Sequence, residues 1–333
     1  MKFGFALRDF LNDPERPMYD QIESAAQVIR RSTSLGFWGA YMTQHWMSHP
    51  TIWLEPFPVL ARLAGENSTL KLITGVVLVP LHNPVHMAEE IVALDHITNG
   101  RFIFGAGLGY RNKELEAVGT TRKDRVARFE ESLGIMKALW SGEEVTVAGK
   151  YWNITQGQLG LKPLQQPNPP IWIASQSPKA ARRAANLGDG CLLAPQVSWA
   201  DVATLSESYW KALDDTNARS SGMLSIHRCI SVSQSRETAV REAREAAEAS
   251  AAMYGGWDMQ ERTMVDLRLG SGRDIHDWAI AGSPEECAEV IHDQIEKTGI
   301  GYIGFTFLNL PRDPERRLEY LQYFSENLLS HFN

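Results

Sequence analysis

Cysteine is scarce in this chain. Only three of the 333 residues are cysteines, and Cys191, Cys229 and Cys287 lie far apart with no CxxC spacing. Neither a disulfide framework nor a cysteine-based zinc site is therefore expected, and we predict no bound metal. Low cysteine usage of this kind is typical of proteins of the reducing cytoplasm, where we expect this chain to work.

An excess of positive charge and long apolar runs are also missing. Lysine and arginine number 33 against 40 acidic residues, which gives a net charge of -7, and no basic cluster interrupts the chain. This balance argues against binding to nucleic acid or to an anionic membrane surface. The longest apolar run, Leu72 to Leu81, contains Gly75 and Pro80 and is too short to span a bilayer.

The motifs of several hydrolase classes are missing as well. No HxH, HExxH or GxSxG sequence occurs, which argues against metal and serine hydrolases. A glycosidase needs two facing carboxylates at strand ends. Asp189 precedes its predicted strand and Asp9 is isolated, so the sequence does not predict that chemistry.

What the chain does contain is a regular alternation of short β-like runs and longer helical patterns, which indicates βα units and a parallel sheet. Eight such runs suit a closed barrel better than an open sheet. We therefore expect an α/β fold, a single (β/α)8 TIM barrel over residues 1–333. The predicted strands are Lys2–Leu7, Trp38–Thr43, Leu70–Leu78, Arg101–Ala106, Ile171–Ala174, Cys191–Ala194, Leu224–Val232 and Tyr302–Phe307.

Three predicted helices begin with a polar residue followed by proline. Asn83 and Ser177 each precede a proline, which is well placed in the first turn because its missing N–H has no helical partner there. The third helix opens with Ser283, and Glu286 stands at the position from which its carboxylate completes a capping box.

Two stretches depart from the alternation. Residues 143–170 are rich in Gly, Pro and Gln, and we expect an insertion at the carboxyl-terminal rim of the barrel. Residues 255–282 carry Trp257, Trp278 and several arginines and glycines. A long loop of this kind is typical of an active-site lid, and we predict that it closes over the substrate.

Three ordered segments carry a resemblance to a known family. They run from Thr74 to Arg101, from Phe104 through Arg111 to Gly119, and from Pro170 to Gly190. Their order and spacing resemble the bacterial luciferase-like flavin- and F420-dependent oxidoreductases. The resemblance implies a TIM-barrel monooxygenase, a flavoprotein that uses reduced FMN (FMNH2) and O2 to oxygenate a small, hydrophobic organic substrate. It also implies a homodimer and a separate flavin reductase as partner.

The segment at the fifth strand is the best candidate for binding the cofactor phosphate. In the family it lies against that phosphate, which implies contacts from Ala174, Ser175, Gln176 and Ser177. A helix N-terminus presents unpaired N–H groups and a partial positive charge, and serine hydroxyls add donors. Ser177 can also simply cap its helix, and both roles are compatible.

The segment after the fourth strand is a second candidate for the cofactor. The resemblance implies contacts from Gly107, Leu108, Gly109, Tyr110 and Arg111, the last two as further phosphate donors. Glycine lets a flat ring or a phosphate approach the backbone closely. The alternative is a tight strand-to-helix turn. Bacterial luciferase offers a cysteine and an arginine where this chain has Gly107 and Leu108, so the reactive thiol is absent.

Two further positions complete the predicted site. Many relatives carry a cis peptide bond behind the flavin ring at the place of Gly75 and Val76. His45 matches a family histidine that acts in acid–base chemistry beside the flavin, a role suited to histidine as a residue type. Without the resemblance a single histidine would be interpreted as a packed or surface residue.

Two alternatives remain open. An F420-dependent member would exchange a hydride with its substrate and need no oxygen, and the same residues fit either cofactor. A barrel that binds flavin without catalysis is the alternative from another functional class, because relatives can keep a fold after losing activity.

Overall fold

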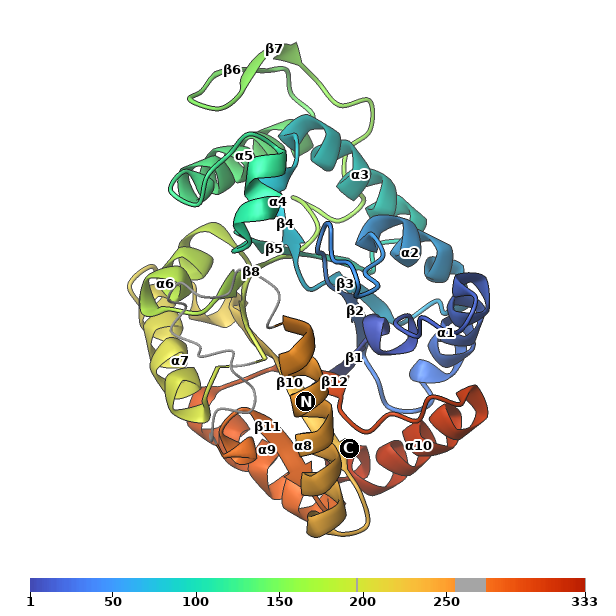
Figure 1. Ribbon diagram of the computed structural model, residues 1–333. Helices are drawn as coiled ribbons and strands as arrows, with labels where there is room; N and C mark the ends of the chain where they lie inside the picture. The colour runs from blue at the N-terminus through green and yellow to red at the C-terminus, as the bar shows by residue number, and fades with distance from the viewer. Residues whose placement is uncertain (196, 255–273, 333) are drawn as a thin grey trace.

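The computed structural model describes residues 1–195, 197–254 and 274–332, and its central feature is a closed parallel β-barrel (Figure 1). The eight strands of the barrel follow one another around it in chain order. They are β1 (Lys2–Ala6), β2 (Gly39–Met42), β3 (Lys71–Thr74), β5 (Phe102–Gly107), β8 (Ile171–Ser175), β9 (Gly190–Leu193), β10 (Met223–Val232) and β12 (Tyr302–Phe307).

The barrel closes because its first strand pairs on both sides. Gly4 of β1 aligns with Gly304 of β12 and with Gly39 of β2, and all of these pairings are parallel. The strands are buried along almost their whole length, as expected of a parallel sheet covered by helices. The predicted TIM barrel is confirmed.

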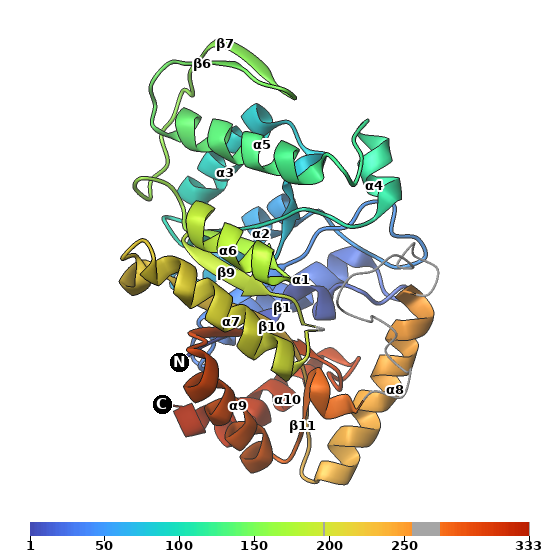
Figure 2. The ribbon, with the colours of Figure 1, turned by 90° about the vertical axis from the view of Figure 1, so that its left-hand side faces the viewer.

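Helices surround the barrel (Figures 1 and 2). All α-helices but α10, which follows the last strand, lie between two strands along the chain. The α-helices are α1 (Met18–Ser32), α2 (Pro56–Leu63), α3 (Pro84–Ile97), α4 (Asn112–Ala117), α5 (Arg125–Trp140), α6 (Pro178–Leu187), α7 (Trp199–Asp214), α8 (Arg236–Tyr254), α9 (Pro284–Thr298) and α10 (Pro314–Asn327). Short 3-10 helices are η1 (Leu7–Phe10), η2 (Ala64–Glu66), η3 (Val79–Leu81), η4 (Arg219–Ser221), η5 (Ile275–Asp277) and η6 (Leu329–Phe332).

The predicted helix starts agree with the structure. Asn83 accepts the N–H groups of Val85 and His86, and Ser177 accepts that of Ala180. Ser283 and Glu286 form the capping box. These local hydrogen bonds were predictable because cap and first turn are neighbours in sequence.

The sequence analysis missed α10. Asp313 caps this helix by accepting the N–H groups of Glu315 and Arg316, and Leu321 and Phe324 are fully buried on its inner face. Phe324 packs edge-on against Phe305 of β12 at a centroid distance of 5.4 Å. The helix thereby covers the seam where the last strand meets the first.

The predicted third strand, 70–78, is broken in two. β3 ends at Thr74, and β4 (Val77–Leu78) pairs with β5 alone, so Gly75 and Val76 form a kink between them. A further strand, β11 (Ala279–Gly282), pairs with the carboxyl-terminal half of β10.

Aromatic side chains fill the amino-terminal end of the barrel. Trp38 stacks on Trp172 at 6.2 Å and lies 5.6 Å from the ring of Tyr302. Each of them lies before or near the start of a strand, so this end of the interior is occupied by a packed core. The chemistry of the barrel is left to the opposite, carboxyl-terminal end.

The segment 143–170, which the sequence analysis expected as an insertion at the rim, lies outside the helical layer, and its Tyr151 bonds to Asp124 before α5. It forms a hairpin of β6 (Val145–Ala148) and β7 (Asn153–Gly157) beyond α5 (Figure 1). The amide of Trp152 donates to Glu131 of α5, and Gln165 donates to Asp95 near the end of α3. The segment connects a helix to the start of the next strand, and such connections return to the amino-terminal side.

Most of the predicted lid, residues 255–273, lies outside the residues that the structure describes. The remainder, 274–282, forms η5 and β11, and Trp278 is buried in a cluster with α8. Trp278 therefore packs inside the fold instead of closing over a substrate. Of the helices described, none has the length and apolar character needed to cross a membrane.

A substitution at Gly304 tests how tightly the barrel interior is packed. A Cβ atom at this position would lie 2.7 Å from His227 Cδ2 and 2.8 Å from Tyr41 Cε1. We expect Gly304→Ala to lower the free energy of unfolding by about 1–3 kcal/mol, because buried rings would have to shift. Urea denaturation measures this loss. Gly65→Ala is the matched control, since no atom lies within 4 Å of its added Cβ; equal stability of the two variants would contradict the packing argument.

Candidate active site

The three segments predicted to contact the cofactor lie side by side at the carboxyl end of the barrel. Leu78 of β4 aligns with Gly107 of β5, and Ala106 aligns with Ile173 of β8. A Cβ atom at Gly107 would lie 2.5 Å from Val76 Cγ2 and 3.7 Å from Ala174 Cβ. Val76, Gly107 and Ala174 thus lie next to one another in one continuous surface, although together they span about 100 residues of the chain.

This surface is made of small and apolar groups. Val76, Leu108, Gly109 and Ala174 are half-buried. The Gly75-Val76 peptide bond is cis, as the resemblance implied. Gly109 has a φ of 72°, a left-handed conformation that favours glycine. A flat ring can approach such a surface without meeting large side chains.

The predicted phosphate segment lies at the N-terminus of α6. Ser175 is buried, and its hydroxyl donates to the carbonyl of Ser177 at 3.3 Å. Ser177 caps the helix by accepting the N–H of Ala180, so the capping role left open above is confirmed. Gln176 is half-buried. In the first turn of α6, Pro178 has no N–H, and the N–H groups of Ala180 and Ala181 bond to the side chain and the carbonyl of Ser177. The N–H of Lys179 is the donor of this turn that an anion at the helix N-terminus could use.

Arg125 stands next to the glycine segment, and the sequence analysis missed it. Its Nη1 donates to the carbonyl of Gly109 at 3.0 Å. Burial, followed by the charges of Arg122 and Arg183, lowers the pKa of Arg125. A bound anion would relieve this crowding of positive charge. Only folding brings Arg125 of α5 close to Arg183 of α6. Their spacing in the chain therefore gave no signal that positive charges gather here.

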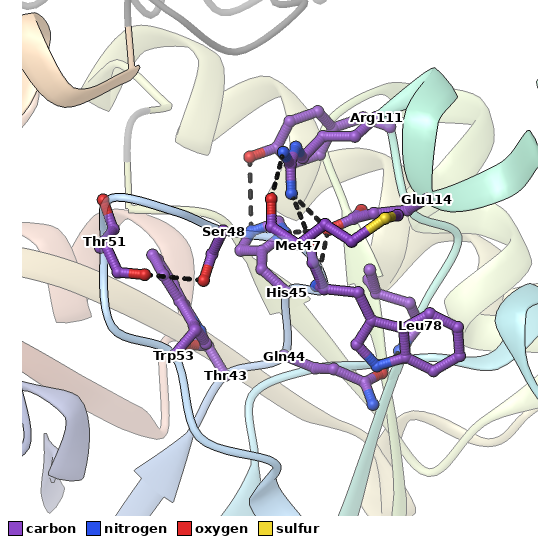
Figure 3. A network of polar contacts seen from close by, with 12 residues as sticks. Thr43, Gln44, His45, Met47, Ser48, Thr51, Trp53, Leu78, Arg111 and Glu114 are labelled. Carbon is purple, nitrogen blue, oxygen red and sulfur yellow. Dashed lines mark hydrogen bonds and ion pairs between the residues drawn. The ribbon is translucent and has the colours of Figure 1, made fainter. Parts of the chain in front are cut away.

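His45 follows β2 and forms a hydrogen-bonded pair with Glu114 of α4 (Figure 3). The distance from His45 Nδ1 to Glu114 Oε1 is 2.9 Å. A carboxylate only accepts hydrogen bonds, so Nδ1 carries the proton and Nε2 of the neutral ring is an acceptor. The hydroxyl of Tyr110 lies 3.4 Å from Nε2. This arrangement leaves Nε2 suited to take up a proton.

Glu114 is the main functional residue that sequence reasoning did not assign. The side chain is buried, and Oε1 also accepts the backbone N–H of Trp46 at 3.0 Å and Nη1 of Arg111 at 2.9 Å. Burial acts to raise the pKa of the Glu114 carboxyl, but the hydrogen bond from His45, the Trp46 N–H and the charge of Arg111 outweigh it and hold the pKa below its usual value. The three-residue spacing of Arg111 and Glu114 was an available signal.

Arg111 lies in a different environment from the one that the sequence analysis gave it. Its guanidinium is buried and donates to the carbonyl oxygens of Trp46 and Met47, at 2.6 and 3.3 Å, as well as to Glu114. Figure 3 shows the side chain directed at this loop. Arg111 therefore holds the loop that carries His45, and Tyr110 contacts the imidazole.

Gln44 connects the loop that carries His45 to β4 by a hydrogen bond. Its Oε1 accepts the N–H of Leu78 at 2.8 Å and lies 3.1 Å from His82 Nε2, while its amide donates to Glu55. Burial lowers the pKa of His82 to about 4, so this histidine is neutral around pH 7. His82 is thus a packing residue of the loop rather than a second acid–base group.

Aromatic rings hold the imidazole of His45 in place. Trp53 packs against it edge-on at 4.8 Å, and Tyr110 does so at 5.4 Å. Trp53 is itself held by a hydrogen bond to Thr43 and by the guanidinium of Arg8, which lies 3.8 Å above its ring. Within the described parts of the chain, no three His, Cys, Asp or Glu side chains gather as metal ligands.

Removing the charge of Glu114 tests the network. We expect Glu114→Gln to lower the free energy of unfolding at pH 7 by about 1.5–3 kcal/mol, because buried hydrogen bonds to a charged group are weakened. The pKa of Glu114 is lowered on folding, so its contribution is present above the pKa of the unfolded chain and is lost as the pH falls through the lower folded value. The penalty should therefore shrink in acid.

Urea denaturation at several pH values measures this penalty. Glu116→Gln is the control, because Glu116 is exposed on the same helix. A penalty for Glu114→Gln that equals the control, or that stays constant down to pH 3, would contradict the assignment.

Comparisons of the sequence with known proteins show which family the chain resembles. Residues 1–301 match the model of the luciferase-like monooxygenase family. The chain is 26% identical over 279 residues to the oxygenase component of the flavin-dependent trigonelline monooxygenase of Acinetobacter baylyi, which covers 81% of this chain and 74% of that protein. It is 33% identical over 173 residues to the protein y4vJ of Sinorhizobium fredii, about half of each chain.

Solved structures share the fold over the full chain. The monooxygenase RslO1 of Streptomyces bottropensis superposes with a TM-score of 0.83 at 23% identity, covering 100% of both chains. The oxygenating constituent of 3,6-diketocamphane monooxygenase of Pseudomonas putida, in complex with FMN, gives 0.79 at 19% identity, covering 99% of this chain and 98% of that one. The F420-dependent tetrahydromethanopterin reductase of Methanopyrus kandleri gives 0.76 at 18%, covering 100% and 99%.

The family model spans most of the chain, and the segments that carry the resemblance meet at one end of a TIM barrel. This protein belongs to the luciferase-like monooxygenase family of oxidoreductases.

Proposed function

We propose that this chain is the oxygenase of a two-component system, which uses FMNH2 and O2 to oxygenate a small hydrophobic substrate. The observation that supports this most is the meeting of Val76, Gly107 and Ala174 in one small-residue surface, next to the loop that carries His45. We further propose that residues 1–333 act as one catalytic domain, that a flavin reductase supplies FMNH2, and that the protein works in the cytoplasm as a homodimer.

The residues of the site fit a flavin nucleotide. Val76 and Ala174, which are half-buried, would contact the ring system, with the buried glycines Gly75 and Gly107 packed next to them. Leu108 and Gly109 would lie at its edge. For the phosphate, the segment Ala174–Ser177 leads into the N-terminus of α6, where the N–H of Lys179 would act as a donor, and Arg125 adds positive charge nearby. Arg111, which is occupied with the His45 loop, positions that loop in this proposal and does not bind the phosphate.

His45 would act as the proton-handling group. Glu114 fixes the imidazole with the proton on Nδ1, so Nε2 is free of that proton and can accept one from a reacting molecule, with Tyr110 close by. Bound FMNH2 would supply the two electrons that the oxygenation needs, and the protein supplies binding, orientation and a site with little water.

An F420-dependent hydride transfer is the alternative reaction. It would use the same surface and the same histidine, and relatives in fold include both an FMN complex and an F420-dependent reductase. We favour FMN because the trigonelline enzyme, which covers most of the chain, is a flavin-dependent monooxygenase. A barrel that binds flavin without catalysis would not require the hydrogen-bonded pair of His45 and Glu114.

Replacing His45 tests its role. We expect His45→Ala to lower turnover by about tenfold or more, because general acid–base catalysis is lost, while the affinity for reduced flavin stays nearly unchanged. Substrate-dependent oxygen consumption over a panel of cyclic ketones and monoterpenes measures turnover. His86→Ala is the control, since His86 is exposed on α3. Turnover at the level of this control would refute the assignment.

Anaerobic titration tests the choice of cofactor. We expect FMNH2 to bind the purified protein more tightly than reduced F420, as monitored by flavin and deazaflavin absorbance. Substitution Ala174→Trp, which fills the small-residue surface, should abolish binding of the preferred cofactor. Tighter binding of reduced F420 would favour the hydride-transfer reaction, and binding of neither would overturn both.

A further inference from the structure

A second group of polar side chains lies on the opposite wall of the barrel mouth. It consists of Asp9 after β1, Tyr41 on β2, Cys229 on β10 and Thr306 on β12, and we call it the mouth cluster. Thr306 and Cys229 are register partners, and the hydroxyl groups of Tyr41 and Thr306 lie 2.8 Å apart. The sequence analysis treated Asp9 as isolated, because its neighbours come from the far end of the chain.

The two carboxyl oxygens of Asp9 differ in their hydrogen bonds. Oδ2 accepts the backbone N–H of Phe307 at 2.8 Å. In the parts of the chain that the structure describes, no donor reaches Oδ1. Asp9, Cys229 and Thr306 are half-buried and Tyr41 is buried. Asp9 follows the end of β1 and Thr306 lies near the end of β12, so the cluster is at the carboxyl-terminal end of the barrel.

The charges around Asp9 do not hold the pKa of its carboxyl at the usual value for aspartate. Burial raises the pKa of Asp9 to about 7, against the lowering effects of the Phe307 N–H, Arg8 and Arg317. Tyr41 and Cys229 face the carboxyl from β2 and β10, and burial raises the pKa of each, so both are neutral. The environment therefore disfavours charge, and it would disfavour a charged ligand for the same reason.

The mouth cluster also lies close to the proposed active site. Arg8, the neighbour of Asp9, packs on Trp53, and Trp53 packs on His45. β1 pairs directly with β2, the strand that leads to His45. A molecule held at Asp9 would therefore lie on the same carboxyl-terminal edge as the imidazole.

We propose that Asp9 recognises the substrate: in its protonated form it donates a hydrogen bond from Oδ1 to the oxygen of a neutral carbonyl or hydroxyl group on an otherwise apolar molecule. This inference rests on the proposed function, because it places a substrate beside the cofactor. It identifies the substrate class as neutral oxygen-bearing compounds, such as ketones and alcohols, rather than amines or carboxylates.

Binding of cyclohexanone to the purified protein, followed by calorimetry at about pH 5.5 and about pH 8.5, tests the proposal. We expect the affinity of the unsubstituted protein to fall by about tenfold or more at the higher pH, because the donor proton is lost. Asp9→Asn keeps an N–H donor and should bind equally at both pH values. Asp9→Leu should bind weakly at both, and Asp20→Asn, at an exposed position, should behave as the unsubstituted protein.

A structural role for Asp9 would predict affinity that does not depend on pH, and that result would overturn the proposal. Tighter binding of cyclohexylamine than of cyclohexanone at pH 8.5 would also overturn it, since an ionised carboxylate would then be binding a cation. If Asp9→Leu fails to fold, the comparison of Asp9→Asn with the unsubstituted protein still decides. FMNH2 affinity is measured separately for each variant and should not change. If the unsubstituted protein does not bind FMNH2, that result contradicts the proposed function, whereas the pH dependence of cyclohexanone binding tests the role of Asp9.

Discussion

The parallel pairing of β1 with both β12 and β2 is the constraint on which the rest of this structure depends. It closes the sheet, and because the strands of the barrel are parallel, it brings all of their carboxyl ends to one rim. The opposite end is filled by Trp38, Trp172 and Tyr302. The residues of the candidate active site and of the mouth cluster therefore lie at one end of the barrel, although they are far apart in the chain.

Within that opening, apolar and polar functions lie on different walls. The side formed by β4, β5 and β8 offers small residues and a helix N-terminus, which suits a flat anionic cofactor. The side formed by β1, β10 and β12 carries Asp9, Cys229 and Thr306. His45 stands near β2, between the two walls, where it can meet groups bound to either. This division is the physical basis of both proposals.

The electrostatics of the two acidic groups show why position matters more than residue type. Glu114 and Asp9 are carboxyl groups in confined surroundings, but folding shifts their pKa values in opposite directions. Glu114 receives hydrogen bonds from His45, Trp46 and Arg111, which outweigh the penalty of burial. Asp9 receives a single backbone N–H, which does not. One group is kept as an anion that orients a histidine, and the other can hold a proton.

The sequence by itself determined the elements whose hydrogen bonds are local and the segments that share a family pattern. Helix starts at Asn83, Ser177 and Ser283 were predictable because a cap bonds within three residues, and the order of βα units indicated a closed barrel. Tertiary structure alone decided the bonds of Arg111 to the His45 loop, the partners of Asp9 and Arg125, and the place of residues 143–170 outside α5. The physical reason is that a buried polar group bonds to whatever complementary donor or acceptor lies nearest in space, and in a barrel that partner can come from strands and helices far away in the chain.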